Sequence, residues 1–177
     1  MIIGLMGYAQ SGKDTAYQEL IKIKGFEKFK RKAFADMLKL EAISMLSAIN
    51  VYETTETLNE KKELYRPLLV WLGEFRRRQK PLYWIDKVID KVIDKEKNII
   101  ITDVRYWNEV KAIQEMGGIV IHILRNGTYP ANEEEQRSIE EILRNTLEDG
   151  YKPAYNFSSK SFLAEQIKHY IEMENKE

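Results

Sequence analysis

The sequence predicts an α/β fold of three layers, in which a parallel β-sheet lies between two layers of helices. The order of two kinds of apolar pattern supports this prediction. Apolar runs of strand length alternate along the chain with stretches in which apolar residues recur at helical spacing. Such alternation is typical of parallel sheets, because each crossover between parallel strands carries a helix that covers the sheet.

The first elements follow directly from this alternation. Residues 1–6 form an apolar run suited to a buried strand, and the apolar spacing over 16–23 predicts the helix that follows. Gly25 interrupts that helix, and residues 29–34 are expected to hold a short strand. A helical stripe then runs over 38–49.

The middle of the chain is expected to be mostly helical. Residues 50–60 are polar and show no clear period, whereas 64–72 is apolar and helical, with Pro67 near a helix start or bend. Pro81 begins another helix, in which an Asp-Lys pattern repeats every four residues over 86–95. We interpret the repeat as charged stripes on the solvent face of an amphipathic helix.

The last part of the chain returns to strands and helices. In order, it holds a strand at 98–104, a helix ended by Gly117-Gly118, a strand at 119–124, a helix over 132–147, a break at Asp149-Gly150, a short segment at 155–158 and a helix over 163–171. The helix over 132–147 is recognised by its start, where Asn132 and Glu135 resemble a capping box. No linker interrupts the pattern, so residues 1–177 are expected to form one domain.

Composition excludes several classes of protein. Lys plus Arg and Asp plus Glu are both 28 among 177 residues, and this neutral balance argues against a nucleic-acid partner. The absence of cysteine excludes disulfides and thiolate chemistry. No apolar run approaches the ~20 residues that cross a bilayer. We therefore expect a cytoplasmic protein without a membrane partner, and a homodimer stays open because dimers are common.

The most informative stretch is Gly7–Thr15, which reads Gly-Tyr-Ala-Gln-Ser-Gly-Lys-Asp-Thr. Gly7, four residues, Gly12 and Lys13 match the phosphate-binding P-loop, or Walker A, pattern, and the preceding strand and following helix supply its context. Glycines let backbone amides turn toward an anion, the helix N-terminus favours negative charge, and the lysine adds a mobile cation. The expected nucleotide-binding residues of the loop are Gly7, Ala9, Gln10, Ser11, Gly12, Lys13, Asp14 and Thr15. The alternative is a strand-to-helix turn without a ligand.

The loop departs from the usual pattern at one position. A serine or threonine normally follows the lysine and binds Mg²⁺ through its hydroxyl, but here Asp14 follows and Thr15 comes one residue later. A carboxylate is also a hard oxygen ligand, so Asp14 is predicted to bind Mg²⁺. The same departure leaves open a nucleotide-binding module without turnover.

A second charged pair follows three consecutive isoleucines. Asp103 ends that strand, where an acidic residue of P-loop proteins usually holds Mg²⁺, and its alternative is a loop or helix-start carboxylate. Arg105 comes two residues later and is suited to bidentate binding of an acceptor phosphate. Its alternative is a salt bridge to Asp103 or Glu109.

Several motifs occur in one order along the chain. They are Ser11-Gly12-Lys13-Asp14-Thr15, Phe34-Ala35-Asp36-Met37-Leu38-Lys39, Trp71-Leu72-Gly73, Tyr83-Trp84-Ile85, Thr102-Asp103-Val104-Arg105, Asn108-Glu109, Gly117-Gly118 and Ile121-His122-Ile123-Leu124-Arg125. With these motifs the chain resembles the deoxynucleoside monophosphate kinases of bacteriophages, a branch of the P-loop nucleoside monophosphate kinase fold. The resemblance is good over residues 1–125 and loose beyond, and its most specific part is the pair Gly-Lys-Asp-Thr and Thr-Asp-Val-Arg.

The resemblance implies a P-loop kinase fold with a monophosphate-binding helical region at about 34–95 and a lid at about 126–148. It implies phosphoryl transfer from ATP, with Mg²⁺, to a nucleoside or deoxynucleoside monophosphate, in the host cytoplasm if the chain is phage-encoded. Acceptor binding would fall to Asp36, Lys39, Arg77, Trp84 and Arg105, ATP binding beyond the loop to Arg125 and Asn156, and catalysis to Lys13, Arg77, Asp103, Arg105 and Arg137.

Three departures from the family pattern affect these assignments. Glu74 directly follows Trp-Leu-Gly and shortens that segment by one residue, so Arg77 competes with the arginines on either side of it. Residues 134–140 replace a His-x-Ser-Glu-like stretch, which leaves the lid residues, Arg137 among them, open. Asn156 is followed by Phe-Ser where the family often has Asp-Gly.

Two other functions remain open from the sequence. A P-loop kinase of another small phosphorylated acceptor is one, because animal-type phosphomevalonate kinases share a Gly-Lys-Asp loop. A non-catalytic module that binds ATP without releasing ADP is the other. We interpret His122, in mid-strand, as a packed residue, and two distant histidines without cysteine do not make a zinc site.

Overall fold

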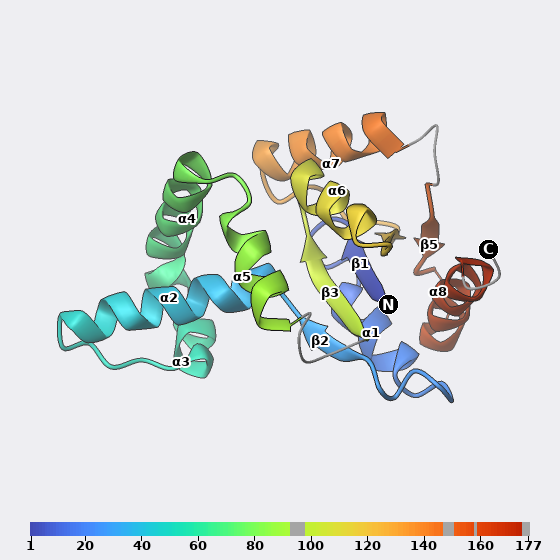
Figure 1. Cartoon of the computed structure of the whole chain (residues 1–177), viewed down its shortest axis with the longest axis horizontal. Coiled ribbons are helices and arrows are strands. Elements are labelled where there is room, and N and C mark those ends of the chain that lie inside the picture. The colour runs from blue at the N-terminus through green and yellow to red at the C-terminus, as the bar shows by residue number, and fades with distance from the viewer. Residues whose placement is uncertain (93–97, 147–150, 158, 175–177) are drawn as a thin grey trace. The chain divides into compact units, whose positions relative to one another are not determined.

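The computed structural model describes residues 1–92, 98–146, 151–157 and 159–174 (Figure 1). The chain divides into two compact units. The first consists of Met1–Lys32 and Glu96–Glu177 and is a parallel sheet with helices on both faces. The second, Ala33–Lys95, is helical, and it matches the segment that we expect to bind the monophosphate.

The sheet of the first unit is parallel throughout, as predicted. Its strands are β1 (Ile2–Met6), β2 (Lys30–Lys32), β3 (Ile99–Val104), β4 (Ile119–Leu124) and β5 (Pro153–Tyr155). Among the described residues the order is β2-β3-β1-β4-β5, with β1 between β3 and β4. The turn after a central strand therefore lies at the carboxyl edge of the sheet, where open α/β folds bind ligands.

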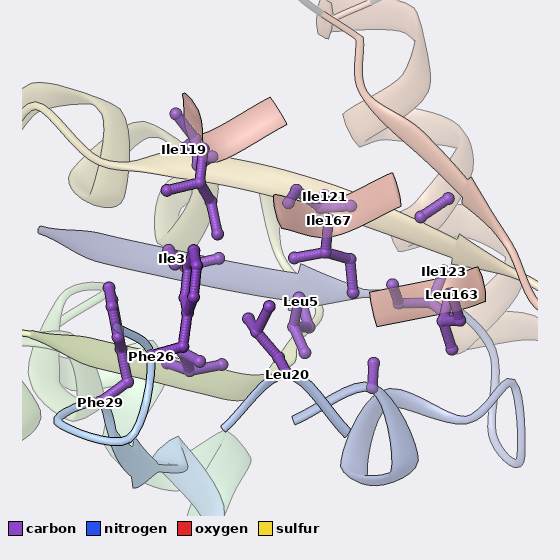
Figure 2. Packing of buried hydrophobic residues seen from close by; sticks show 14 residues of the cluster. Ile3, Leu5, Leu20, Phe26, Phe29, Ile119, Ile121, Ile123, Leu163 and Ile167 are labelled. Atoms are coloured by element: carbon purple, nitrogen blue, oxygen red, sulfur yellow. The ribbon is translucent and has the colours of Figure 1, made fainter. Parts of the chain in front are cut away.

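One face of the sheet is covered by α1 (Lys13–Leu20) and α8 (Lys160–Glu174). Ile3 and Leu5 of β1 pack with Leu20 of α1 and with Ile121 and Ile167 of β4 and α8, and all of them are fully buried (Figure 2). Every second strand residue faces this layer because side chains alternate across a sheet. Burial of each such side chain contributes about 1.5–3 kcal/mol.

The opposite face is covered by α6 (Trp107–Glu115), on which α7 (Glu133–Thr146) packs. Gly4 of β1 lets α6 approach closely. A Cβ atom at Gly4 would lie 2.8 Å from Ile113 Cδ1 of α6, 3.0 Å from Val104 Cγ2 and 3.1 Å from Val120 Cγ2. Gly117, with φ 71°, follows the end of α6, so the predicted helix stop is confirmed.

The second unit consists of α2 (Phe34–Ala48), α3 (Thr55–Glu60), α4 (Lys62–Gln79) and α5 (Tyr83–Val92). Glu41 of α2 joins three of these helices. Its carboxylate accepts hydrogen bonds from Arg76 Nε of α4 (2.6 Å) and from Tyr83 Oη (2.6 Å) and Lys87 Nζ (3.0 Å) of α5. Burial raises the pKa of Glu41, but these bonds outweigh it and hold the pKa below its ordinary value.

The helix α3 was not predicted, because residues 50–60 show no apolar period. The helix has six residues and buries one of them, Leu58, so it gives no repeating pattern. Its start is fixed by a reciprocal cap, in which Thr57 N donates to Thr54 Oγ1 (3.2 Å) and Thr54 N donates to Thr57 Oγ1 (2.8 Å). Capping of this kind depends on two threonines and is visible only once the helix is known.

Smaller differences concern the ends of helices. The helix α1 ends at Leu20, and Ile23 packs against the core from the turn beyond it. Pro67, expected near a helix start or bend, lies inside the first half of α4. The predicted break at Asp149-Gly150 and the end of the Asp-Lys repeat lie outside the described residues. None of the described helices is both long and apolar enough to cross a bilayer.

Gly4→Ala is expected to destabilise the protein by about 1–3 kcal/mol, because three methyl groups must shift to admit the new Cβ. Gly73→Ala is the matched control, since its Cβ would meet Arg77 at an ordinary 3.5 Å and an alanine favours the helix by roughly 0.5–1 kcal/mol. Urea denaturation of both variants measures the difference. Equal free energies of unfolding would show that α6 does not need the small residue.

Candidate functional site

The loop between β1 and α1 has the close backbone approaches that its glycines predict. Gly7 has φ 141°, and a Cβ there would lie 2.5 Å from Ile123 O of β4. Gly12, with φ 104°, is the N-cap residue of α1, and a Cβ there would lie 2.4 Å from Asn156 Nδ2. Gln10, at φ 64°, adopts a left-handed conformation that disfavours most side chains. The loop therefore turns tightly against the sheet edge before the N-terminus of α1, where an anion is favoured.

Lys13 folds back over this loop. Its Nζ donates to Gly7 O at 2.7 Å and to Tyr8 O at 2.8 Å. These backbone carbonyls are neutral acceptors. The charged oxygens of a phosphate would accept hydrogen bonds from the ammonium more strongly. The lysine is thus poised to exchange these partners for an anionic ligand.

Charged groups of the first unit gather around this lysine. Burial lowers the pKa of Lys13, the Arg105 guanidinium lowers it further, and the carboxylates of Glu135, Asp14 and Asp103 oppose the shift. The two predicted metal ligands and the predicted phosphate-binding arginine therefore act electrostatically on the same ammonium. Their roles in binding metal and phosphate stay predictions.

Three hydrogen bonds tie the loop to later parts of the chain. They run from Ala9 N to Glu135 Oε1 (3.1 Å), from Arg125 Nη1 to Gln10 O (3.3 Å) and from Asn156 Nδ2 to Ser11 O (2.9 Å). The structure thus brings Arg125 and Asn156 to the loop, as expected. It also adds Glu135, which the sequence indicates only as part of a helix start.

A hollow of about 370 Å³ lies beside the start of α1. It is lined by Thr15, Arg125, Asn126, Asn156, Phe157 and Lys160. The ring of Phe157 is 5.0 Å from that of Tyr155, and both rings are exposed. Aromatic and guanidinium faces beside amide groups suit a flat heteroaromatic ring, such as a nucleotide base.

The two carboxylates predicted to bind Mg²⁺ have different surroundings. Asp14 is 69% exposed at its side chain, and its Oδ1 accepts a bond of 3.2 Å from Arg31 Nε of β2. Asp103 is half-buried on β3. Groups of three or more acidic or histidine residues that could hold a metal do not occur among the described residues. Two carboxylates nevertheless fit Mg²⁺, which takes few protein ligands when phosphates complete its shell.

Arg105 follows β3, and its backbone is held by a buried carboxylate. Glu109 Oε2 accepts the backbone N–H groups of Arg105 (2.7 Å) and Tyr106 (3.1 Å). This acceptor fixes the start of α6 and the direction of the chain at Arg105. The exposed guanidinium extends from a fixed backbone position.

In the second unit the structure distinguishes the three consecutive arginines. Arg76 binds Glu41 and lies 4.8 Å from the centroid of the Tyr83 ring. Arg78 is exposed and pairs with Glu74 on the same helix face, at 3.4 Å. Arg77 is half-buried, and its guanidinium lies against Gly73. The structure thus gives partners for Arg76 and Arg78, and the role of Arg77 as a phosphate ligand stays a prediction.

Other predicted acceptor residues have mixed positions. Asp36 and Lys39 are half-buried near the start of α2. Trp84 is only 4% exposed, and its Nε1 donates to Gly73 O at 3.2 Å. The ring packs inside the second unit between α4 and α5, which leaves it little access to an acceptor.

The helix expected to belong to a lid is well anchored at its base. Ile139 and Ile142 of α7 are buried, as is Glu135. Arg137 lies on the outer side of this helix, where its side chain is 77% exposed and pairs with Glu133 at 2.6 Å. Its catalytic role stays a prediction.

His122 of β4 is a packed residue, as the sequence indicates. It is buried, and its Nδ1 lies 2.8 Å from Tyr151 Oη, beside a cavity of about 150 Å³. Burial lowers the pKa of His122 to about 4, with a further contribution from Lys13. The imidazole is therefore neutral at physiological pH.

Comparisons with known proteins identify the family of the chain. The family model described as deoxynucleotide monophosphate kinase matches residues 74–149. A protein of Acanthamoeba polyphaga mimivirus, provisionally named a deoxynucleotide monophosphate kinase, is 30% identical over an alignment of 189 residues. The alignment, gaps included, covers 85% of this chain and 92% of that protein.

Two solved structures are similar at low sequence identity. A gluconokinase from Sinorhizobium meliloti 1021 has a TM-score of 0.52 and 10% identity, over 98% of this chain and 93% of that chain. A sugar kinase from Janibacter sp. HTCC2649 has a TM-score of 0.48 and 14% identity, over 97% and 94%. The similarity to the gluconokinase shows a shared fold. No conclusion is drawn from the weaker similarity to the sugar kinase.

The buried histidine predicts a pH dependence of stability. The unfolded chain binds a proton at His122 with an ordinary pKa of 6.5, whereas the folded protein does so only at about 4. The stability of the folded state is therefore full above pH 6.5 and falls by about 3 kcal/mol as the pH drops towards 4. We expect His122→Gln to flatten the pH dependence of the free energy of unfolding in urea.

His169→Gln is the matched control, because this histidine is exposed on α8. It should leave the profile unchanged. An equal effect of both substitutions would contradict the assignment.

Proposed function

Because this chain belongs to the deoxynucleotide monophosphate kinase family, we propose that it takes the phosphoryl group from ATP and binds the triphosphate with Gly7–Thr15. The chain is a nucleotide monophosphate kinase, and the donor, the metal and the residue roles are what the proposal adds. The observation that carries the proposal is the position of the Lys13 ammonium, which is hydrogen-bonded to the carbonyls of the loop. The charges of Asp14, Asp103 and Arg105 all act on this ammonium.

The donor phosphates would bind to the loop and to Lys13. The ammonium would leave the carbonyls of Gly7 and Tyr8 for phosphate oxygens, which are stronger acceptors. The N-terminus of α1 adds its partial positive charge to the same region. Support for ATP comes from the hollow of about 370 Å³, where Phe157 and Arg125 offer faces for a purine ring.

Asp14 and Asp103 would hold Mg²⁺, because both carboxylates act on the ammonium that is proposed to bind the phosphates. The bound cation would neutralise charge on the β- and γ-phosphates. Arg31 pairs with Asp14 in the structure described, so this guanidinium competes with a cation for the carboxylate. Its charge offsets that of Asp14 when no cation is bound.

The acceptor would be a deoxynucleoside monophosphate, in keeping with the family. In the first unit we assign acceptor binding to Arg105. In the second unit the predicted acceptor residues are Arg77, Asp36 and Lys39. The acceptor phosphate is already an anionic nucleophile near neutral pH. The residues therefore need only align two anions and offset their repulsion, without a general base.

We assign the lid role to the predicted region of about 126–148, and within its described residues the loop of 126–132 is the part that would close. The buried residues of α7 favour a fixed base, whereas Tyr129 is exposed on the loop. Closure of this loop over ATP would limit transfer to water, and Arg137 remains the candidate that would stabilise the transferring group. Nucleotide substrates also favour the cytoplasm as the location.

The direct test is an ADP-release assay with ATP, Mg²⁺ and a panel of nucleoside and deoxynucleoside monophosphates. We expect turnover with at least one deoxynucleotide and a fall of kcat/KM on the order of 10²–10³ in Lys13→Ala, because a charge that binds the transferring group is lost. Lys22→Ala removes an exposed lysine just beyond the same helix and should have normal kinetics. ATP binding without ADP release on any acceptor would establish the non-catalytic module instead.

A second prediction concerns the metal. Asp14→Asn should raise the Mg²⁺ concentration needed for half-maximal activity several-fold, because an amide oxygen is a weaker ligand than a carboxylate. Arg31→Gln should have the opposite sign, since it removes the cation that pairs with Asp14. Magnesium titrations of both variants measure these shifts. If the two substitutions moved the midpoint in the same direction, Asp14 would not be a metal ligand.

A further inference from the structure

We propose that Glu135 is a positioning residue that holds the phosphate-binding loop in its binding conformation through the Ala9 N–H. The inference rests on the proposed function, because it concerns the loop that would bind ATP. Glu135 itself belongs to α7, more than a hundred residues beyond the loop in sequence. Its role would be to shape the loop without touching the nucleotide.

The carboxylate of Glu135 is buried and fully engaged by backbone donors. The residue is only 7% exposed, although Glu133 and Glu134 beside it are exposed. One oxygen, Oε1, accepts Ala9 N at 3.1 Å, and the other, Oε2, accepts Ala131 N at 2.6 Å. Burial of a carboxylate costs free energy unless its oxygens are hydrogen-bonded, so both contacts offset the cost of burying this side chain.

The contact falls at the strained part of the loop. Gln10, the residue after Ala9, has φ 64°, a conformation that a non-glycine residue holds only when its surroundings enforce it. Before this residue, the N–H of Ala9 donates to Glu135. At the residue itself, the carbonyl of Gln10 accepts a bond of 3.3 Å from Arg125 Nη1. Both partners come from the segment that follows β4. This segment therefore forms hydrogen bonds to the backbone on both sides of the left-handed residue.

A capping role does not explain the side chain. Asn132 Oδ1 already accepts the N–H of Glu135 at 2.8 Å and caps α7, so the predicted capping box is half confirmed. The side chain of Glu135 does not complete the box, because it binds Ala131 N instead. Glu133 and Glu134 also supply negative charge to the first turn of the helix.

A purely electrostatic role would work against the reaction. The Glu135 carboxylate acts on Lys13 and so lies near the phosphate site, where a negative charge opposes an incoming triphosphate. As a charge alone, Glu135 weakens ATP binding. As a geometric constraint on the loop, it strengthens ATP binding, and the two roles therefore predict opposite signs.

The test compares Glu135→Gln and Glu135→Asp with the unmodified protein. The glutamine removes the charge and presents an NH₂ group to one of two N–H donors, whereas the aspartate keeps the charge but is too short to reach both. We expect both variants to raise the KM for ATP roughly tenfold, the scale of one hydrogen bond to a charged group. The KM for the acceptor should stay within about twofold, because the acceptor does not bind this loop.

Two measurements distinguish a positioning role of Glu135 from a general loss of structure. Glu141→Gln removes a charge from an exposed position of the same helix and should keep both KM values. Hydrogen exchange of the Ala9 amide, measured without nucleotide, should be faster in both Glu135 variants and unchanged in Glu141→Gln. This readout needs no ATP, so it still decides the proposal if ATP proves not to be the donor.

The outcomes are distinct. A lower KM for ATP in Glu135→Gln with an unchanged KM in Glu135→Asp would show that the residue acts only as a charge, and would overturn the proposal. Unchanged exchange at Ala9 would also overturn it. If Glu135→Gln did not fold, the kinetics and exchange of Glu135→Asp would decide alone.

Discussion

The first unit depends on one close approach, that of the loop after β1 to the strand and loop beside it. A Cβ at Gly7 would collide with the backbone oxygen of Ile123 of β4, and Gly12 has φ 104°, which side chains rarely adopt. Both positions therefore favour glycine, and Lys13 follows the second as the first residue of α1. The apolar sheet makes the close approach possible, because β1 lies between β3 and β4 with its side chains packed on both faces. The backbone of the loop thus sets where Lys13 stands in the chain, and the carbonyls of Gly7 and Tyr8 hold its ammonium.

In the first unit, two buried carboxylates accept hydrogen bonds from backbone N–H groups. Glu109 holds the chain at Arg105, and Glu135 holds the loop at Ala9. In both cases an acidic side chain with little access to water sets the path of a segment that carries charged, functional side chains. This division of work leaves Lys13 and Arg105 available to ligands while the backbone beneath them stays fixed.

The sequence was sufficient where a signal is local. The strand, loop and helix from Ile2 to Leu20 and the helix stop at Gly117 depend on short-range spacing and on backbone conformation, and both are readable from residue type. Pairing across the chain is not readable in this way. Nothing in the spacing joins Arg31 to Asp14 or Glu135 to Ala9, because those contacts exist only after the sheet brings distant segments together. The run of three arginines was ambiguous for the same reason, since the bond of Arg76 to Glu41 joins two different helices.

The carboxylate of Glu41 has a consequence for the second unit as a whole. Donors from α4 and α5 converge on this single group of α2, so the orientation of each helix depends on the others through one shared acceptor. Loss of one donor leaves the remaining bonds in place, whereas loss of the acceptor releases all of them together. The helices that carry Asp36, Lys39 and Arg77 would therefore loosen cooperatively rather than one at a time.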